Sequence, residues 1–565
     1  MYDRKLPLNM VSNAALSPKA QGWLRHLWRK ATTPDDWTRA GKPHPWWDGY
    51  SIPPMLNFPR FDLSESSYGL LIMARKTPAW REVYVRILDE MIRRHTTYWA
   101  AIDWLTYLGP DPKRASYPKS YKRLIPKHLW GQYDVPGWTA NGVEPWGLSP
   151  DPIGSEGNLF FRGFFNLMLA IYRDVAGTDT WDKPFQVTGL DDRTFSWTHG
   201  QINQFLSEQW ARVWHGPHCE NTKVWPFCLS AAGLGLQLSD QTLGSKGHWV
   251  VDRWIEDFLK KKCMGFDRRG NLKWVGLYYD PLIDYVQGRS AVAGLFPALY
   301  VLPQNRALAE DLYRKAVAAV GWDKAWLPTI APKSQPRGAT LGYLLAREFG
   351  DATTARRLGR VLEKNANGRF FASVDDEEPE EFGYFYGYGE RYPRGQESAL
   401  QILTDVMDPG DWYAAFNHLD GDRHAAPTVE GIDFPKLGIR QAHNDSLDGV
   451  LTVETYAATR AASGEPTRWR VTNLSDAASV VVERNGQTFG GWRRVDDRVI
   501  EITSTIASQT FRVRTGWAGA ATTRPTATRV ASSSRSSRVS SVNPLEIVTA
   551  RLEIAAGASG CPCCA

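Results

Sequence analysis

The sequence contains little cysteine and no long hydrophobic run. Six cysteines occur among 565 residues, and three of them, Cys561, Cys563 and Cys564, lie within the last five residues. So few cysteines in a chain of this length exclude a disulfide framework. No stretch approaches the roughly 18 consecutive apolar residues that a membrane-spanning helix requires, so we expect no membrane span.

A marked excess of one charge is also missing. The 67 Lys and Arg residues are nearly balanced by 61 Asp and Glu residues, and the net charge of +6 is spread along the chain. A nucleic-acid partner is therefore not expected. The first 24 residues lack an apolar segment followed by a small-residue cleavage site, so we expect a cytoplasmic protein. The apolar content of 43% and aromatic content of 12% are typical of a globular protein.

From about residue 10 to 445, apolar residues recur with a period near 3.6. One apolar stripe ends at Gly177 and consists of Phe164, Leu167, Met168, Ile171 and Tyr172. Similar patterns end at Gly244 and Gly350. Repeated helices with glycine stops predict an antiparallel helical array. Such an array forms either an open solenoid or a closed α/α barrel. Loops rich in Trp, Gly and Pro favour a barrel with a ligand at its mouth, although the 25 tryptophans also suit a bulky core.

Near residue 448 the period changes to two, which predicts a small antiparallel β-domain. Strand-like segments include 451–456, 468–471, 479–483 and 498–503, with a turn at Asn485-Gly486. Residues 520–542 are mostly Ser, Thr, Ala and Arg, a composition that favours a disordered tail. We therefore predict a helical domain over residues 1–447, a β-domain over 448–518 and a flexible tail over 519–565.

The segment from His218 to Cys228 is the first candidate for chemistry. Cys219 and Cys228 lie nine positions apart, just ahead of a helix expected to begin near Leu229. Pro226 predicts a loop that folds back, so both thiols face one pocket in this interpretation. The positive end of a helix favours the thiolate form of cysteine, and so does a nearby His or Lys. The alternative is that both cysteines are small buried apolar residues.

A second segment consists of Asp151-Pro152-Ile153 followed by Gly163, Asn166, Leu167 and Met168, and it is interpreted together with the segment that carries the cysteines. Together the two segments resemble the linalool dehydratase/isomerase family. In that family a DPI-x-x-E-N segment leads into a helix carrying G-H-x-N-L-M, and a later C-E-x7-C segment precedes another helix. The similarity spans about residues 45–420, including Tyr68-Gly69-Leu70 and the segment Leu344 to Asp351.

The resemblance implies an (α/α)6 barrel that assembles as a homo-oligomer. It also implies an apolar pocket that dehydrates or isomerises a small terpene alcohol without a cofactor. Cys219 and Cys228 match the family cysteines, and Asp48 and Tyr50 are plausible equivalents of its Asp and Tyr. The position of the family histidine holds Phe164 here.

Removal of a hydroxyl group requires an acid to protonate its oxygen and a base to accept a proton afterwards. We expect Cys219 or His218 to act as the acid, because Phe164 cannot, and Asp48 or Glu220 to supply the complementary charge. The alternative is that the substrate is larger and that the reaction is an isomerisation or a cyclisation. Aromatic side chains stabilise a cationic stage. The predicted catalytic residues are Cys219, Cys228, Asp48, Tyr50, Glu220 and His218, and the predicted substrate-binding residues are Phe164, Tyr68, Phe61, Trp225, Tyr384 and Tyr388.

Other interpretations remain open. Three potential ligands within five residues, His215, His218 and Cys219, are too crowded to favour a metal site, and we expect none. Helical barrels followed by β-domains also occur in polysaccharide lyases and glycoside hydrolases. A non-catalytic helical scaffold is the third possibility. An apolar pocket with two thiols indicates terpenoid chemistry, a carboxylate-lined groove indicates sugars, and a filled interior indicates a scaffold.

Overall fold

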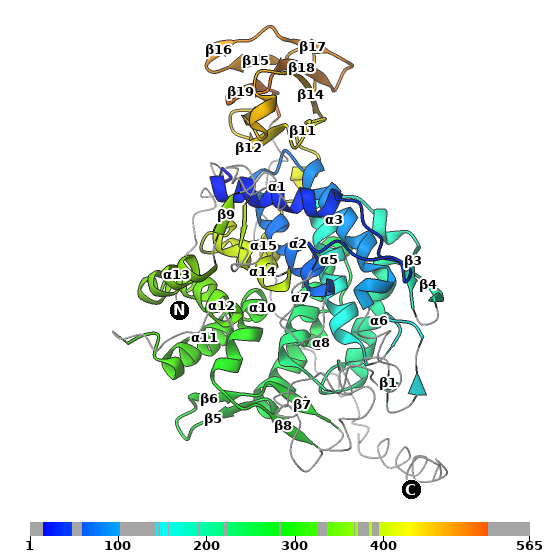
Figure 1. Cartoon of the computed structure of the whole chain (residues 1–565), viewed down its shortest axis with the longest axis vertical. Coiled ribbons are helices and arrows are strands. Elements are labelled where there is room, and N and C mark those ends of the chain that lie inside the picture. Colours follow the sequence, from blue (N-terminus) through cyan, green and yellow to red (C-terminus); the bar gives the residue numbers. More distant parts are fainter. Residues whose placement is uncertain are drawn as a thin grey trace, which may run out of the picture. The chain divides into compact units, whose positions relative to one another are not determined.

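The computed structural model is mainly helical, with antiparallel sheets towards the C-terminus, as the sequence predicts (Figure 1). It describes residues 15–47, 59–101, 143–144, 147–148, 150–155, 157–189, 192–219, 223–281, 284–324, 336–366, 368–370, 384–386 and 395–517. Among these residues, no helix is both long and apolar enough to cross a membrane. The predicted tail lies outside the described residues.

The α-helices in chain order are α1 (Pro18–Thr32), α2 (Pro59–Lys76), α3 (Glu82–His95), α5 (Leu159–Ala176), α6 (His199–Arg212), α7 (Pro226–Leu243), α8 (Trp249–Trp254), α9 (Lys260–Lys262), α10 (Leu295–Gln304), α11 (Arg306–Val320), α12 (Pro336–Glu348), α13 (Ala352–Ala366), α14 (Gly395–Val406) and α15 (Asp411–Asn417). Short hairpins interrupt them: β1 (Val143–Glu144) with β2 (Gly147–Leu148), β3 (Phe185–Thr188) with β4 (Thr194–Trp197), β5 (Met264–Phe266) with β6 (Leu272–Val275), β7 (Tyr278–Asp280) with β8 (Tyr285–Gln287), and β9 (Gly368–Phe370) with β10 (Tyr384–Tyr386).

Six of the described helices form a closed cycle of packing partners. Helix α2 packs against α5, α5 against α7, α7 against α10, α10 against α12, α12 against α14, and α14 against α2. We call these six helices the helix cycle. Others pack onto its members, including α3 and α6 onto α5, α11 onto α10, and α13 onto α12. Figure 1 shows α2, α5, α7 and α10 near one another although they come from distant parts of the chain.

Local sequence explains the ends of α5 and α7. Both helices end at glycines in the left-handed conformation, Gly177 with φ 66° and Gly244 with φ 71°, which confirms the predicted stops. The start of α7 differs from the prediction. The helix begins at Pro226 rather than near Leu229, because the fixed φ of proline suits the first helical position, where its missing N–H is not needed.

Glycines allow α5 and α7 to pack with their backbones close together. A Cβ atom on Gly163 would lie 2.8 Å from the Cβ of Ala232, and one on Gly235 would lie 3.0 Å from the backbone nitrogen of Leu167. The first distance is shorter than real Cβ contacts, and the second is so tight that the neighbouring backbone would have to shift. Gly163 is one of the residues that carry the family resemblance. In this structure it allows the close packing of α5 against α7.

The C-terminal strands form two antiparallel sheets. One has the order β11 (Thr428–Glu430), β14 (Pro466–Thr472), β18 (Ile500–Thr505), β17 (Trp492–Arg494); the other has the order β12 (Leu437–Asp445), β13 (Val450–Ala457), β19 (Gln509–Arg514), β15 (Val481–Arg484), β16 (Gln487–Thr488). The turn at Asn485-Gly486 joins β15 to β16, and both turn residues have positive φ, as the sequence predicts.

The strands of the two C-terminal sheets begin before residue 448, where the sequence predicts the change of period. The first of these strands is β11, at Thr428, and the long strand β12 also begins before residue 448. The first three residues of β12, Leu437 to Ile439, are all buried, so its sequence does not alternate between apolar and polar residues. The division into a domain over residues 1–447 and another over 448–518 itself stays a prediction.

A buried histidine yields a prediction for acid stability. The His95 ring at the end of α3 is fully buried and stacks on Phe165 at 4.5 Å between centroids. Burial, followed by the charge of Arg60, lowers the pKa of His95 to about 3. The unfolded chain takes up a proton near pH 6.5 that the folded chain rejects, so stability is lost as the pH falls below 6.5.

We expect His95→Phe to remove this acid sensitivity while keeping the ring stack. Between pH 8 and pH 5 the wild type should lose about 2 kcal/mol more unfolding free energy than the variant. Urea denaturation at the two pH values measures the difference. Equal losses in both proteins would show that His95 is protonated, or bonded to another group, in the folded state.

Candidate functional site

Aromatic side chains from four members of the helix cycle meet inside the protein. Phe61 of α2 contacts Phe164 of α5 at 5.1 Å between centroids, Phe164 contacts Phe227 of α7 at 5.4 Å, and Phe227 contacts Tyr300 of α10 at 5.4 Å. We call these four residues the aromatic cluster. Phe61, Phe227 and Phe164 lie at the third, second and sixth positions of their helices, so the cluster forms near the helix N-termini.

The structure brings together three of the predicted substrate-binding residues. Phe61 and Phe164 belong to the aromatic cluster, and Tyr68 contacts it through Tyr300, at 6.0 Å between ring centroids. Phe61 and Tyr68 are seven positions apart on α2 and therefore lie on the same face of the helix. That face also carries Glu65, which the sequence interpretation missed.

Glu65 is the centre of a buried polar group. Its carboxylate accepts hydrogen bonds from both terminal nitrogens of Arg337 in α12, one of them at 2.9 Å, and from the Tyr300 hydroxyl at 3.3 Å. The Glu65 side chain is fully buried. Burial raises the pKa of Glu65, and the charge of Arg337 opposes that rise. The Arg337 guanidinium also lies over the Phe227 ring, 5.2 Å from its centroid.

The two tyrosines beside Glu65 keep their protons. Burial is the largest cause that raises the pKa of Tyr68 and of Tyr300 well above 10, and the Glu65 charge raises both further. Neither phenol ionises near neutral pH. The arrangement therefore offers neutral hydroxyl groups and a compensated ion pair next to apolar rings.

The two predicted cysteines are both buried. The segment that carries them connects the first turns of α5 and α7: the backbone nitrogen of Leu159 in α5 donates to the carbonyl of His218 at 3.2 Å, and Cys228 is the third residue of α7. The backbone nitrogen of Cys219 donates to the carbonyl of Lys223 at 2.8 Å, which closes the start of the segment. That the two sulfur atoms face a common space stays a prediction.

The surroundings of His218 argue against its suggested role as proton donor. Burial, with the charges of His215 and Arg162 as further causes, lowers the pKa of His218 to about 3. At neutral pH the imidazole is therefore uncharged. An uncharged imidazole is a very weak acid, so His218 is not suited to protonate a leaving hydroxyl group.

Of the other predicted residues, Trp225 and Tyr384 can be located in the structure, and the rest lie outside the described residues. Trp225 precedes α7 and contacts Tyr278 at 5.0 Å between ring centroids. Tyr384 belongs to β10, opposite Phe370 in β9. Four predicted residues, Asp48, Tyr50, Glu220 and Tyr388, lie outside the described residues.

Sequence reasoning missed Glu65, Phe227, Tyr300 and Arg337. A local signal existed for Glu65, because Phe61, Glu65 and Tyr68 follow the spacing of one helix face. Phe227 directly precedes Cys228 and was overlooked next to it. Tyr300 and Arg337 have no local signal, since they reach Glu65 from 235 and 272 residues away in the sequence.

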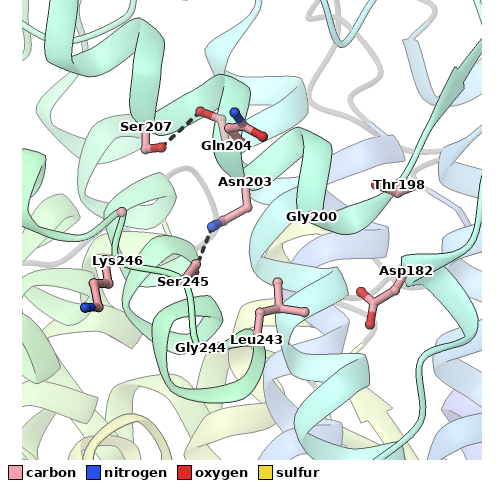
Figure 2. Close-up of a pocket in the computed structure, with 11 residues that line it drawn as sticks. Asp182, Thr198, Gly200, Asn203, Gln204, Ser207, Leu243, Gly244, Ser245 and Lys246 are labelled. Carbon is pink, nitrogen blue, oxygen red and sulfur yellow. Dashed lines mark hydrogen bonds between the residues drawn. The ribbon is translucent and has the colours of Figure 1, made fainter.

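A separate pocket of about 550 Å³ lies near the other end of α7 (Figure 2). Most of the residues that line it are of polar types, among them Asn203, whose side chain donates to the Ser245 hydroxyl at 3.0 Å. Its carboxylate, Asp182, forms an ion pair with Arg173. Leu243 of the lining is 16 residues from Phe227 along α7, about 24 Å. The residues that line this pocket include none of the predicted site residues.

Fold and site together define a predominantly helical protein in which buried aromatic, ionisable and thiol side chains gather at the N-terminal ends of neighbouring helices. The linalool dehydratase/isomerase family model matches residues 127–372, a range that contains α5, α7 and the two predicted cysteines, Cys219 and Cys228. The match confirms, over these residues, the resemblance seen in the sequence. Helix α2, with Phe61 and Tyr68, lies before the matched range.

Comparisons with other proteins add little. The endoglucanase CelQ from Clostridium thermocellum, solved with cellotriose, is 10% identical with a TM-score of 0.30, covering 88% of this chain and 93% of that chain. A β-L-arabinofuranosidase from Geobacillus stearothermophilus T6 is 10% identical with a TM-score of 0.25, covering 89% and 81%. Similarities this weak define neither fold nor function. No curated protein matches the sequence.

The buried ion pair gives a prediction for stability. Arg337→Met leaves the Glu65 carboxylate buried without its partner, which should lower the unfolding free energy by about 3–5 kcal/mol. Adding Glu65→Gln removes the stranded charge and keeps an acceptor for Tyr300, so the double variant should recover at least half of the loss. Denaturant unfolding of both proteins measures the effect. A loss below about 1 kcal/mol for Arg337→Met would mean that solvent screens the pair.

Proposed function

We propose that the protein is a cofactor-independent lyase or isomerase that acts on a terpenoid or another alkenol. The family match over residues 127–372, which includes Cys219 and Cys228, is the observation that carries this proposal. The family supports lyase or isomerase chemistry as a class. The substrate and the direction of the reaction are the proposed part.

The proposed architecture is an (α/α)6 barrel in which the helix cycle forms the inner ring. The closed series of packing partners, from α2 round to α14 and back, supports it. Helices that pack onto members of the cycle, such as α3, α6, α11 and α13, would then form the outer ring. The homo-oligomer that the family implies is part of the same proposal.

The proposed substrate pocket adjoins the aromatic cluster. Rings of Phe61, Phe164 and Phe227 give an apolar surface for a hydrocarbon skeleton. Their negative faces would stabilise a cationic stage by about 0.5–2 kcal/mol for each good contact. The positive charge of Arg337 would oppose such a cation, and the paired Glu65 carboxylate offsets that charge.

The proposed reaction begins as an acid protonates the hydroxyl oxygen and the C–O bond breaks. Water leaves, and an allylic cation remains where a double bond adjoins. A base then removes a proton from a neighbouring carbon, which gives a diene, or water returns at the other end of the allyl group, which gives an isomer. We assign the proton transfers to Cys219 and Cys228, with Asp48, Tyr50 and Glu220 as the proposed supporting groups.

This assignment follows from the properties of the other groups near the cluster. Phe164 stands where the family has a histidine, and His218 is uncharged at neutral pH. Tyr68 and Tyr300 hold their protons too strongly to release them fully. Thiols can act in either direction, because their environment adjusts their acidity over a wide range.

We expect Cys219→Ala and Cys228→Ala each to reduce turnover at least 100-fold while the protein stays folded. The assay incubates purified protein with monoterpene and sesquiterpene alcohols and analyses the volatile products. Cys263→Ala is the matched control, because Cys263 is also buried, and burial raises the pKa of its thiol to about 12. Normal turnover in both single variants would contradict the proposal, as would equal losses in all three.

A further inference from the structure

The exposed aromatic side chains of this protein are concentrated in one stretch of the chain. Within the described residues, the exposed tryptophans, phenylalanines and tyrosines all come from residues 214–285: Trp214 is 49% exposed, Trp249 52%, Phe266 46% and Tyr285 37%. Single exposed apolar residues are common on protein surfaces, but a gathering of large aromatic ones marks an interaction surface. Trp214, Phe266 and Tyr285 lie on or against two hairpins, β5–β6 and β7–β8.

Two of these rings belong with the β7–β8 hairpin. The Trp214 ring lies 4.9 Å from that of Phe258 and 6.4 Å from that of Tyr279 in β7, between centroids. Tyr285 is the first residue of β8. The backbone N–H and carbonyl of Tyr279 bond to the carbonyl and N–H of Val224, each at 2.8 Å. The hairpin is therefore joined to the segment that carries the cysteines, two residues before α7 begins.

The β5–β6 hairpin extends the same surface. The N–H of Gly276, just after β6, donates to the carbonyl of Cys263, just before β5, at 2.8 Å. Val275 of β6 exchanges two backbone hydrogen bonds with Ser290, which follows β8, both at 3.0 Å. These bonds connect the two hairpins, and in Figure 1 their four strands lie together below α8. Phe266, the last residue of β5, directly precedes the hairpin tip.

The tip of the β5–β6 hairpin carries an excess of positive charge. Arg268, Arg269 and Lys273 are exposed, and none of them forms an ion pair with a described residue. The carboxylate of Asp267 instead accepts hydrogen bonds from the backbone N–H groups of Arg269 and Asn271, each at 2.8 Å. The lysines of α9, by contrast, are each paired with a carboxylate. The hairpin thus presents three positive side chains against one carboxylate, next to an exposed phenylalanine.

We propose that the two hairpins bind the surface of an anionic lipid membrane. The docking surface consists of Trp214, Phe266, Arg268, Arg269, Lys273 and Tyr285. Aromatic side chains enter the interface between the headgroups and the acyl chains, while arginine and lysine are attracted to the negative charge of the lipid headgroups. The contact is peripheral. This inference goes beyond the proposed function and does not depend on it.

Charge and geometry favour a membrane over other partners. A nucleic-acid strand requires basic side chains that follow its backbone along a groove, whereas the basic side chains of the docking surface are confined to one hairpin. If the docking surface paired with that of a second copy, the two positive tips would repel each other. An anionic bilayer complements both the positive tip and the apolar rings. It would also concentrate the proposed substrate, because alkenols partition into bilayers.

Sedimentation of the full chain with vesicles tests the role of charge. We expect the wild type to bind vesicles of phosphatidylglycerol and phosphatidylcholine more tightly than vesicles of phosphatidylcholine alone. Each basic contact strengthens binding about fivefold, so the triple variant Arg268→Gln, Arg269→Gln, Lys273→Gln should bind the anionic vesicles about 100-fold more weakly.

A second triple variant is the matched control for net charge. Arg360→Gln, Arg468→Gln and Arg512→Gln together remove the same charge from exposed arginines that lie outside the docking surface. This variant should bind the anionic vesicles as tightly as the wild type does, because only charges that reach the headgroups contribute.

The same assay tests the aromatic side chains. Burial of a half-exposed ring in the interface strengthens binding about fivefold, so Trp214→Ser combined with Phe266→Ser should weaken it about 25-fold. The matched control combines Val481→Ser with Val495→Ser, at residues that are 44% and 41% exposed near the C-terminal sheets. This control should bind like the wild type.

Several outcomes would overturn the inference. They are no vesicle binding by the wild type, equal binding to neutral and anionic vesicles, and binding that the docking-surface variants retain or that the controls lose equally. A single-stranded oligonucleotide that binds more tightly than vesicles, and only while the three basic residues are present, would assign the surface to nucleic acid instead. A dimer that dissociates in the Trp214→Ser, Phe266→Ser variant, without vesicle binding by the wild type, would assign it to a second copy. None of these outcomes affects the assay for turnover.

Discussion

The ion pair between Glu65 and Arg337 is the interaction on which the site depends. Two charges that are this deeply buried persist only if each has its partner and its remaining hydrogen bonds. Arg337 is the second residue of α12, Glu65 lies on α2, and Tyr300 on α10 donates the third bond. The pair therefore fixes the relative positions of three members of the helix cycle. It also sets the direction of the Tyr300 hydroxyl, because a carboxylate cannot donate.

Close packing of α5 against α7 fixes the other side of the site. Gly163 and Gly235 remove the side chains that would otherwise hold the two helices apart. Phe164, next to Gly163, then meets Phe227 at the start of α7. The same approach brings the first turn of α5 within hydrogen-bond distance of His218, so one packing contact positions both an aromatic ring and the segment that carries the cysteines.

How far the sequence predicts this structure depends on the range of the interactions involved. Helix stops at Gly177 and Gly244 are local and were predicted correctly, whereas the start of α7 was misplaced because Pro226 was read as part of a loop. Strand β12 was missed because its first residues are all buried and do not alternate. Phe61, Tyr68 and Phe164 were found through helix spacing and family resemblance. Tyr300 and Arg337 were not, because only the folded chain brings them to Glu65.

The replacement of the family histidine by Phe164 is consistent with the rest of the site. Phe164 contacts the rings of Phe61, Phe227 and Tyr300, and the Tyr300 proton is already donated to Glu65. A histidine at this position would be surrounded by rings, and burial would favour its uncharged form, as it does for His95 and His218. In that form the histidine would be a poor proton donor at neutral pH. An aromatic ring instead adds apolar surface for the substrate, and the proposed reaction leaves proton transfer to the two thiols.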